Sequence, residues 1–131
     1  MKTLIRLGLA FALLFMISNA SYAQPAGMTA KEYNQLLISL LKDSNIGIRG
    51  SAVELLGQRK VIEAVDPLVN MLKTEKNNSV RIAVALTLHK IGDSKALPAL
   101  KKASKRDKCS SVRNIARAIV KEMESVQVAV K

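Results

Sequence analysis

The sequence repeats with a period of 32 residues. Arginine stands at the same place in three copies, at positions 49, 81 and 113, and an acid lies six residues before each of them. The acid–arginine pairs are Asp43 with Arg49, Glu75 with Arg81, and Asp107 with Arg113. An aliphatic residue directly precedes each arginine, and another follows it seven residues later. Four columns that keep one period over three copies predict a repeat protein, in which each copy packs on its neighbours.

Apolar residues recur with helical spacing in every copy, so we expect six helices. Their expected ranges are about 29–42, 46–58, 62–74, 78–91, 95–105 and 110–124. Thr29 and Glu32 have the spacing of a capping box at the first helix start. The apolar stripes of the first three helices include Leu36, Ile48 and Ile62, which are therefore expected to be buried. The fourth helix is apolar around most of its circumference, which predicts a central position with cover on both sides.

The middle copy resembles a known repeat. The segment SVRIAVALTLHKIGDSKALPAL, residues 79–100, is similar to the HEAT-like repeat named after the phycobilisome lyases. The shared features are the hydrophobic–Arg start, the Ile-Gly-Asp turn and the Ala–Pro–Leu segment. The resemblance extends over residues 43–123, but the first copy has QRKV at 58–61 in place of the turn.

This resemblance implies an all-α fold, a short right-handed α-solenoid of about three HEAT-type helical hairpins. The expected repeat domain spans 29–125, with repeats at about 29–58, 62–92 and 94–124. A tail, 126–131, is expected to be disordered or to extend the last helix. The family role that the resemblance implies is protein binding or scaffolding, and the repeat carries no catalytic residues to transfer.

The first 23 residues have the pattern of a secretory signal peptide. Two basic residues, Lys2 and Arg6, precede an apolar run, Leu7 to Ile17, and small residues at Ser21 and Ala23 suit cleavage after Ala23. The run is shorter than the roughly 20 residues that a membrane span requires. We therefore expect export to the periplasm or beyond the cell, with a short leader, 24–28, before the repeats.

The acid–arginine columns have two interpretations. The side chains of Arg49, Arg81 and Arg113 would form an anion-binding stripe if they faced solvent. Alternatively, each acid and arginine pair within or between repeats, forming a structural ladder that sets the stacking angle. We favour the ladder, because a repeat stack needs a fixed angle at each junction.

Basic residues concentrate in the last third of the chain. Ten Lys and Arg lie between Lys90 and Lys121, against Asp93 and Asp107, and the whole chain carries a formal charge of +11. The predicted partner-binding face consists of Glu54, His89, Lys90, Lys101, Lys102, Lys105, Arg117 and Lys121. This charge would attract an acidic protein, or an anionic lipid or polysaccharide of the envelope. The alternative is a solvated face without a partner.

Nucleic acid is not an expected ligand, because no aromatic residue is interleaved with the basic ones for base stacking. Neither a catalytic centre nor a metal or cofactor is expected, since one His and one Cys provide too few suitable ligands. His89 falls in one column with Gly57 and Lys121, which we interpret as a surface column. An accessory role in an enzyme or modification complex remains an alternative, and the oligomeric state is open.

Cys109 is the lone cysteine, so the chain has no internal disulfide. It falls near the start of the last helix, with Lys108 before it and Arg113 after it. This setting favours the thiolate and makes Cys109 a candidate reactive thiol. The alternative is an unreactive free thiol.

Overall fold

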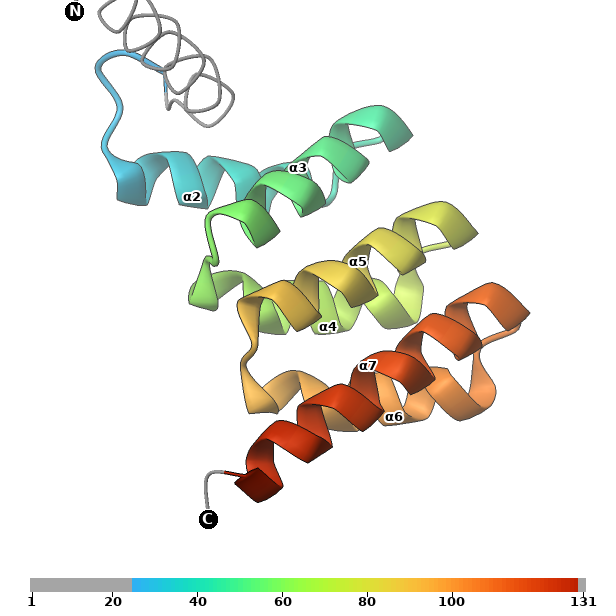
Figure 1. Cartoon of the computed structure of the whole chain (residues 1–131). Coiled ribbons are helices and arrows are strands. Elements are labelled where there is room, and N and C mark those ends of the chain that lie inside the picture. Colours follow the sequence, from blue (N-terminus) through green and yellow to red (C-terminus); the bar gives the residue numbers. More distant parts are fainter. Residues whose placement is uncertain (1–24, 130–131) are drawn as a thin grey trace, which may run out of the picture.

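The computed structural model describes residues 25–129, and this range contains six α-helices (Figure 1). They are α2 (Ala30–Leu40), α3 (Ile46–Gln58), α4 (Val65–Thr74), α5 (Asn78–Ile91), α6 (Leu97–Arg106) and α7 (Ser110–Ala129). The short 3₁₀ turns η1 (Ile62–Ala64) and η2 (Ser94–Ala96) lead directly into α4 and α6. No strand occurs in the range described. The predicted signal peptide, 1–23, lies outside these residues.

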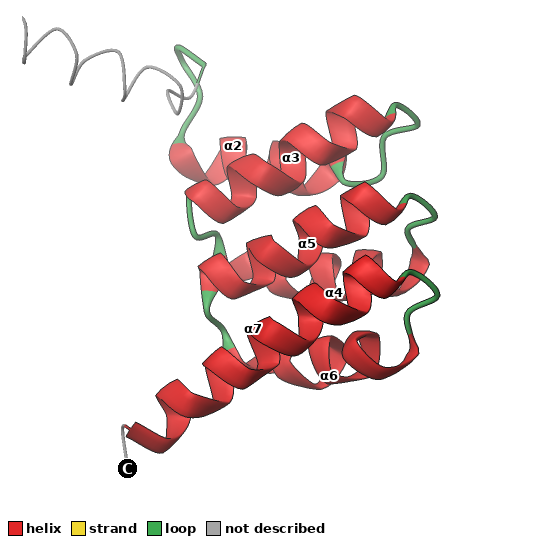
Figure 2. Cartoon of the chain, turned by 45° about the vertical axis from the view of Figure 1, so that its right-hand side comes forward, coloured by secondary structure: helices red, strands yellow, loops and turns green. Residues whose placement is uncertain are grey.

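The helices form two layers. Figures 1 and 2 show α3, α5 and α7 side by side in one layer, with α2, α4 and α6 behind them. Consecutive helices pair as hairpins, and α3 packs on α5 as α5 packs on α7. Each hairpin thus stacks on the next, which confirms the predicted all-α solenoid of three helical pairs.

The second helix of the first two hairpins begins with the same local arrangement. The side chain of Asn45 accepts hydrogen bonds from the backbone N–H groups of the first turn of α3, and Asn77 does the same for α5. An asparagine at this place satisfies amides that have no partner within the helix. The capping box predicted for α2 is present: the N–H of Glu32 donates to Thr29 Oγ1 at 3.2 Å, and the N–H of Thr29 donates to Glu32 Oε2 at 2.8 Å.

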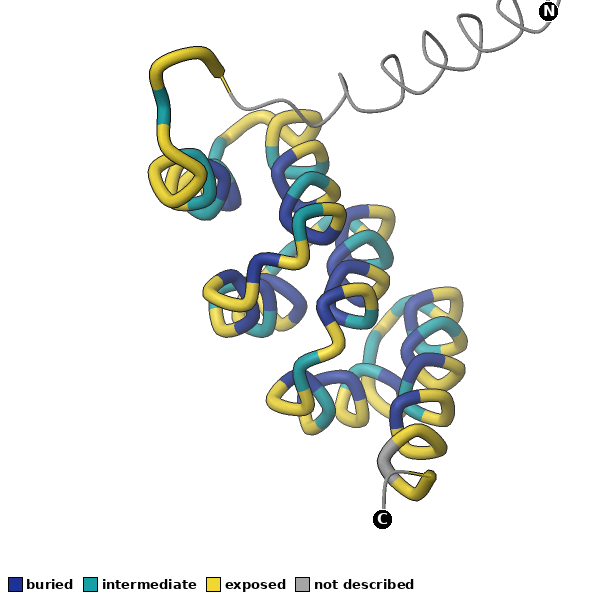
Figure 3. Tube along the Cα trace, turned by 60° about the vertical axis from the view of Figure 1, so that its left-hand side comes forward, coloured by how far each residue is buried: buried dark blue, intermediate teal, exposed yellow. Residues whose placement is uncertain are grey.

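The core is aliphatic. Leu56, Leu68, Leu88 and Leu100 are fully buried, and burying one such side chain contributes about 1.5–3 kcal/mol. Helix α5 buries residues on several sides, namely Val80, Arg81, Val84, Ala85, Thr87, Leu88 and Ile91. It lies between α3 and α7 in its layer (Figure 3). The central position predicted from its apolar circumference is confirmed.

Three residues predicted to be buried are exposed. Leu36 is 39% exposed, Ile48 41% and Ile62 54%. Ile62 opens η1, at the position that the exposed Ser94 has in the next repeat. Leu36 and Ile48 lie in the first hairpin, which no other hairpin of the described residues precedes. These segments are helical as predicted, and Leu36 and Ile48 lack the neighbouring hairpin that buries their equivalents.

The last helix ends later than predicted. Helix α7 continues to Ala129, so most of the predicted tail extends the last helix.

The turn after α3 contains Lys60 at φ 49°, the left-handed conformation that Gly92 adopts at φ 77° after α5. A side chain in this conformation is strained, whereas glycine is not. The QRKV turn therefore has Lys60 where the next repeat has Gly92, and the backbone is left-handed at both residues.

Candidate partner-binding surface

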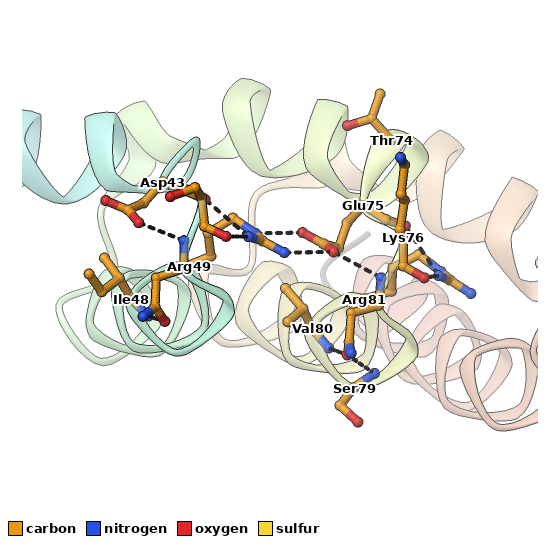
Figure 4. Close-up of polar contacts among 12 residues, drawn as sticks. Asp43, Ile48, Arg49, Thr74, Glu75, Lys76, Ser79, Val80 and Arg81 are labelled. Atoms are coloured by element: carbon orange, nitrogen blue, oxygen red, sulfur yellow. Dashed lines mark hydrogen bonds and ion pairs between the residues drawn. The ribbon is translucent and has the colours of Figure 1, made fainter.

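The arginine of each inner junction binds the acid of the following repeat. Arg49 donates from Nε to Glu75 Oε2 at 2.9 Å and from Nη2 to Glu75 Oε1 at 3.1 Å. Its Nη1 donates to the backbone carbonyls of Asp43 and Ser44, both at 3.0 Å. Figure 4 shows this guanidinium held between the loop before α3 and the carboxylate of the next repeat. One side chain therefore ties its own loop to the following hairpin.

Arg81 repeats this arrangement at the second junction. Its Nε and Nη2 donate to the two carboxylate oxygens of Asp107 at 2.8 and 2.7 Å, and Nη1 donates to the carbonyls of Glu75 and Lys76. The side chain is only 3% exposed. A guanidinium buried this deeply is closed to an external anion.

The acids Glu75 and Asp107 also accept hydrogen bonds from backbone amides. The carboxylate of Glu75 accepts the N–H of Asn77 at 2.8 Å, and that of Asp107 accepts the N–H of Cys109 at 2.8 Å. The hydrogen bonds from Arg49 hold the pKa of Glu75 below its ordinary value, and those from Arg81 do the same to the pKa of Asp107. Both carboxylates are therefore ionised, and each orients the loop at the start of a helix.

The ladder is offset by one repeat, and this offset leaves both ends open. At the last position, Arg113 donates from Nη1 to its own loop, the carbonyl of Asp107, at 2.7 Å. No carboxylate of the described residues lies against it. At the first position, Asp43 accepts the N–H of Asn45 at 2.7 Å, and no described arginine donates to its carboxylate. The column spacing could not reveal this offset, because pairing within and between repeats gives the same columns.

The residues of the predicted face are divided between the layers. Glu54 is on α3 of the first hairpin, while His89 and Lys90 are on α5. Lys101, Lys102 and Lys105 are on α6, and Arg117 and Lys121 are on α7. Only the α6–α7 group shares one end of the stack, since these helices form the last hairpin. The basic residues there are exposed, whereas Glu54 and Lys90 belong to earlier hairpins.

Two of these basic residues at the C-terminal end already have partners. Lys101 Nζ lies 2.6 Å from Glu124 Oε1, which joins α6 to α7. Arg117 donates to Asn114 Oδ1 at 3.0 Å and to the Ser104 carbonyl at 3.4 Å. The pairs of the described residues leave Lys102, Lys105 and Lys121 without a neutralising acid.

The interpretation of His89 as an exposed surface residue is wrong. The side chain is 31% exposed, and its Nε2 lies 3.3 Å from Glu122 Oε2 of α7, while Nδ1 is buried without a hydrogen-bond partner among the described residues. Gly57, in the same column, is buried against Thr87 of the next hairpin. This column faces the following repeat, and Lys121 is exposed at the last hairpin of the described residues.

Cys109 precedes α7, in the column of the capping residues Asn45 and Asn77. The backbone N–H of Val112 lowers the pKa of its thiol, with a smaller contribution from Ser111. Of the causes that the sequence suggested, the helix start therefore lowers this pKa, and the neighbouring Lys108 and Arg113 are not among its main causes. Reactivity of the half-buried thiol remains a prediction.

The sequence did not predict a groove between α2 and α4. Its volume is about 790 Å³, and Ile38, Leu41 and Met71 contribute apolar lining, with Lys42 and Lys76 among its polar residues. It depends on the spacing between two helices that are distant in the sequence, so no local pattern could have indicated it.

Within residues 25–129, no three His, Cys, Asp or Glu side chains are placed to hold a metal ion. None of the helices described is both long and apolar enough to cross a bilayer.

The family model for HEAT repeats matches residues 34–120, which is more than half of the 131-residue chain. No curated protein matches the chain. The match is to HEAT repeats in general, and the narrower resemblance to the phycobilisome-lyase type stays a prediction.

Proposed function

Since the chain belongs to the HEAT repeat family, we propose that it is a docking module without catalytic activity of its own, whose C-terminal hairpin binds an acidic partner protein. HEAT repeats generally serve as scaffolds for interactions between proteins. The proposal adds the chemistry of the partner and the part of the stack that it contacts.

The observation that carries this proposal is the unneutralised charge of the last hairpin. The acids that could balance it are engaged: Asp107 binds Arg81, Glu124 binds Lys101, and Glu122 contacts His89. The exposed basic side chains of the hairpin include Lys102, Lys105, Arg106, Arg117 and Lys121. Such a surface accelerates the approach of an acidic partner and disfavours a basic one.

The protein partner is favoured over nucleic acid by the lack of stacking groups. Tyr33 is the one aromatic residue in the described chain, and it lies in the first hairpin under the guanidinium of Arg59, 5.0 Å from its ring centre. Base recognition on single strands depends on exposed aromatic faces next to basic residues. The α6–α7 surface has the charge without these faces.

We place this interaction outside the cytoplasm, in the periplasm or at the cell envelope. The support is the pattern of residues 1–23, a basic start followed by an apolar run and small residues before the suggested cleavage site. Sequencing the N-terminus of protein recovered from a periplasmic fraction tests this location. Mature protein should begin at Gln24, and protein that retains Met1 in the cytosol would contradict it.

The test of the docking surface is a pull-down from envelope extract. Arg117→Glu with Lys121→Glu should abolish recovery of the partner, because the two changes reverse charge on α7 without touching the core. The matched control is Lys31→Glu with Lys42→Glu, an equal change of charge on exposed residues of the first hairpin.

The outcomes separate the alternatives. Recovery of one stoichiometric protein, lost in the α7 double variant and kept in the control, supports the proposal. Equal recovery by both variants would show that the basic surface is only solvated. Retention by anionic vesicles or polysaccharide that vanishes at about 0.15 M salt would instead indicate an electrostatic envelope binder. A partner with enzymatic activity would make the chain an accessory subunit.

A further inference from the structure

The first hairpin exposes apolar side chains that its successors bury. Leu36, Leu68 and Leu100 are equivalent, 32 residues apart, and they are 39%, 0% and 0% exposed. Ile48, Val80 and Val112 are likewise equivalent, and they are 41%, 5% and 0% exposed.

Among the described residues, the first hairpin differs from the second in having no hairpin before it. Both the first and the second hairpin are followed by a further hairpin, so contacts on the C-terminal side do not explain their difference in exposure. Leu36 also lies outside the lining of the α2–α4 groove. The N-terminal end of the stack therefore exposes Leu36 and Ile48 beside polar residues, since Glu32 and Ser39 stand where Ala64 and Met71 are buried in the second hairpin.

The two open ends of the acid–arginine ladder are complementary. Asp43 orients its loop through the N–H of Asn45, just as Glu75 and Asp107 do through the N–H groups two residues after them. What it lacks, among the described residues, is the arginine of a preceding repeat. Arg113 is anchored on the carbonyl of Asp107 as Arg81 is on that of Glu75, and it lacks the following acid.

We infer that a second copy of this protein stacks end to end on the first. The carboxylate of Asp43 in one copy would accept hydrogen bonds from Nε and Nη2 of Arg113 in the other, the two groups that bind the acid at the inner junctions. Leu36 and Ile48 would be covered by the last hairpin of that other copy. Such a contact joins two different surfaces, so it can add further copies in the same direction. It uses the same pairing as the two inner junctions.

The new junction is weaker than the inner ones. Arg117 and Lys121 take the places that Val53 and Gly57 have in the first hairpin, so cover comes from Val120 and from the aliphatic stems of charged side chains. The copies also repel each other through their net charge of +11. Salt screens this long-range repulsion more than it screens a partly buried ion pair. Association should therefore strengthen from low salt to about 0.15 M, whereas binding of an acidic partner weakens.

The test measures the mass of the full chain in solution by sedimentation velocity, over a wide range of protein concentration and at both salt conditions. The wild type should form dimers and longer species as concentration rises. Arg113→Glu and Asp43→Arg should each lower the association constant by about tenfold or more, because each places like charges at the junction. Combining both changes in one chain restores an opposite-charge pair and should restore association.

Two controls keep the inference falsifiable. Circular dichroism melts identify any variant that fails to fold, and Ile48→Ser tests the apolar part of the junction without a change of charge. A wild type that stays monomeric at every concentration would overturn the inference. Association that is unchanged by Arg113→Glu but lost in Ile48→Ser would also overturn it, because that result indicates two N-terminal ends packed together. Arg117 and Lys121 lie within the same junction, so salt separates the two proposals: self-association should strengthen from low salt to about 0.15 M, whereas binding of an acidic partner should weaken.

Discussion

Replacing Arg81 by alanine should be among the most destabilising single changes on a polar residue of the described chain. The guanidinium is 3% exposed and makes two hydrogen bonds to Asp107, two to backbone carbonyls and one to Asn78. Its removal leaves the carboxylate of Asp107, 9% exposed, without its counter-ion. Breaking a buried ion pair on one side costs about 3–5 kcal/mol of stability. Because water can enter this junction once the side chain is removed, we expect a loss of about 3 kcal/mol.

The assay is thermal unfolding followed by circular dichroism at neutral pH. For a domain of this size about 3 kcal/mol corresponds to a drop in Tm of about 12 °C or more. Arg113→Ala is the matched control, because it removes the same residue type at the equivalent position, where the side chain makes one hydrogen bond to a carbonyl. Its Tm should stay near that of the wild type. Equal and small shifts in both variants would refute the structural role of the ladder.

The same variant changes the dependence of stability on pH. The pKa values of Glu75 and Asp107 are lowered in the folded state, so the folded protein binds protons less readily than the unfolded chain. Their contribution is present above the ordinary carboxyl pKa of about 4 and is lost as the pH falls through the lowered folded values. Acid unfolding of the wild type should therefore steepen below about pH 4. Arg81→Ala should flatten this dependence, and an unchanged slope would count against the pairing of Arg81 with Asp107.

Two further predictions concern glycine positions. Lys60→Gly should raise stability by about 0.5–1 kcal/mol, because glycine relieves the left-handed φ of 49° that Gly92 adopts without strain; a lower Tm would contradict this. Gly57→Ala should destabilise by about 1–2 kcal/mol, since its Cβ would lie 2.9 Å from Oγ1 of the buried Thr87. Gly50→Ala is the control, with open space around the Cβ, and should stabilise by about 0.5–1 kcal/mol. Parallel shifts of these two alanine variants in urea or thermal melts would show that the α3–α5 contact is not tight.

The helices and their starts could be predicted from the sequence because they depend on residues a few positions apart. The capping box of Thr29 and Glu32 needs only a spacing of three. The 32-residue period likewise indicated a stack of hairpins before any contact was known. The central position of α5 followed from its composition, since a helix apolar on most sides must be covered on most sides.

The candidate surface could be predicted only in part. Composition located the positive charge in the last third of the chain, and it could not say which charges are already balanced. Lys101 binds Glu124 and His89 contacts Glu122 because α6, α5 and α7 meet in the folded chain. Salt bridges across helices depend on side chains brought together by packing, which no spacing within one helix encodes.

By itself, the sequence determined which elements form and how often they repeat, because helix formation and capping are governed by local hydrogen bonds. Tertiary structure alone decided what each repeated position faces. Leu36 and Leu68 are the same residue at equivalent places, yet one is 39% exposed and the other fully buried. Arg81 and Arg113 also share a place in the repeat, and only Arg81 has a carboxylate from the next hairpin. Burial and pairing depend on a neighbouring hairpin, and the two ends of a stack each lack one.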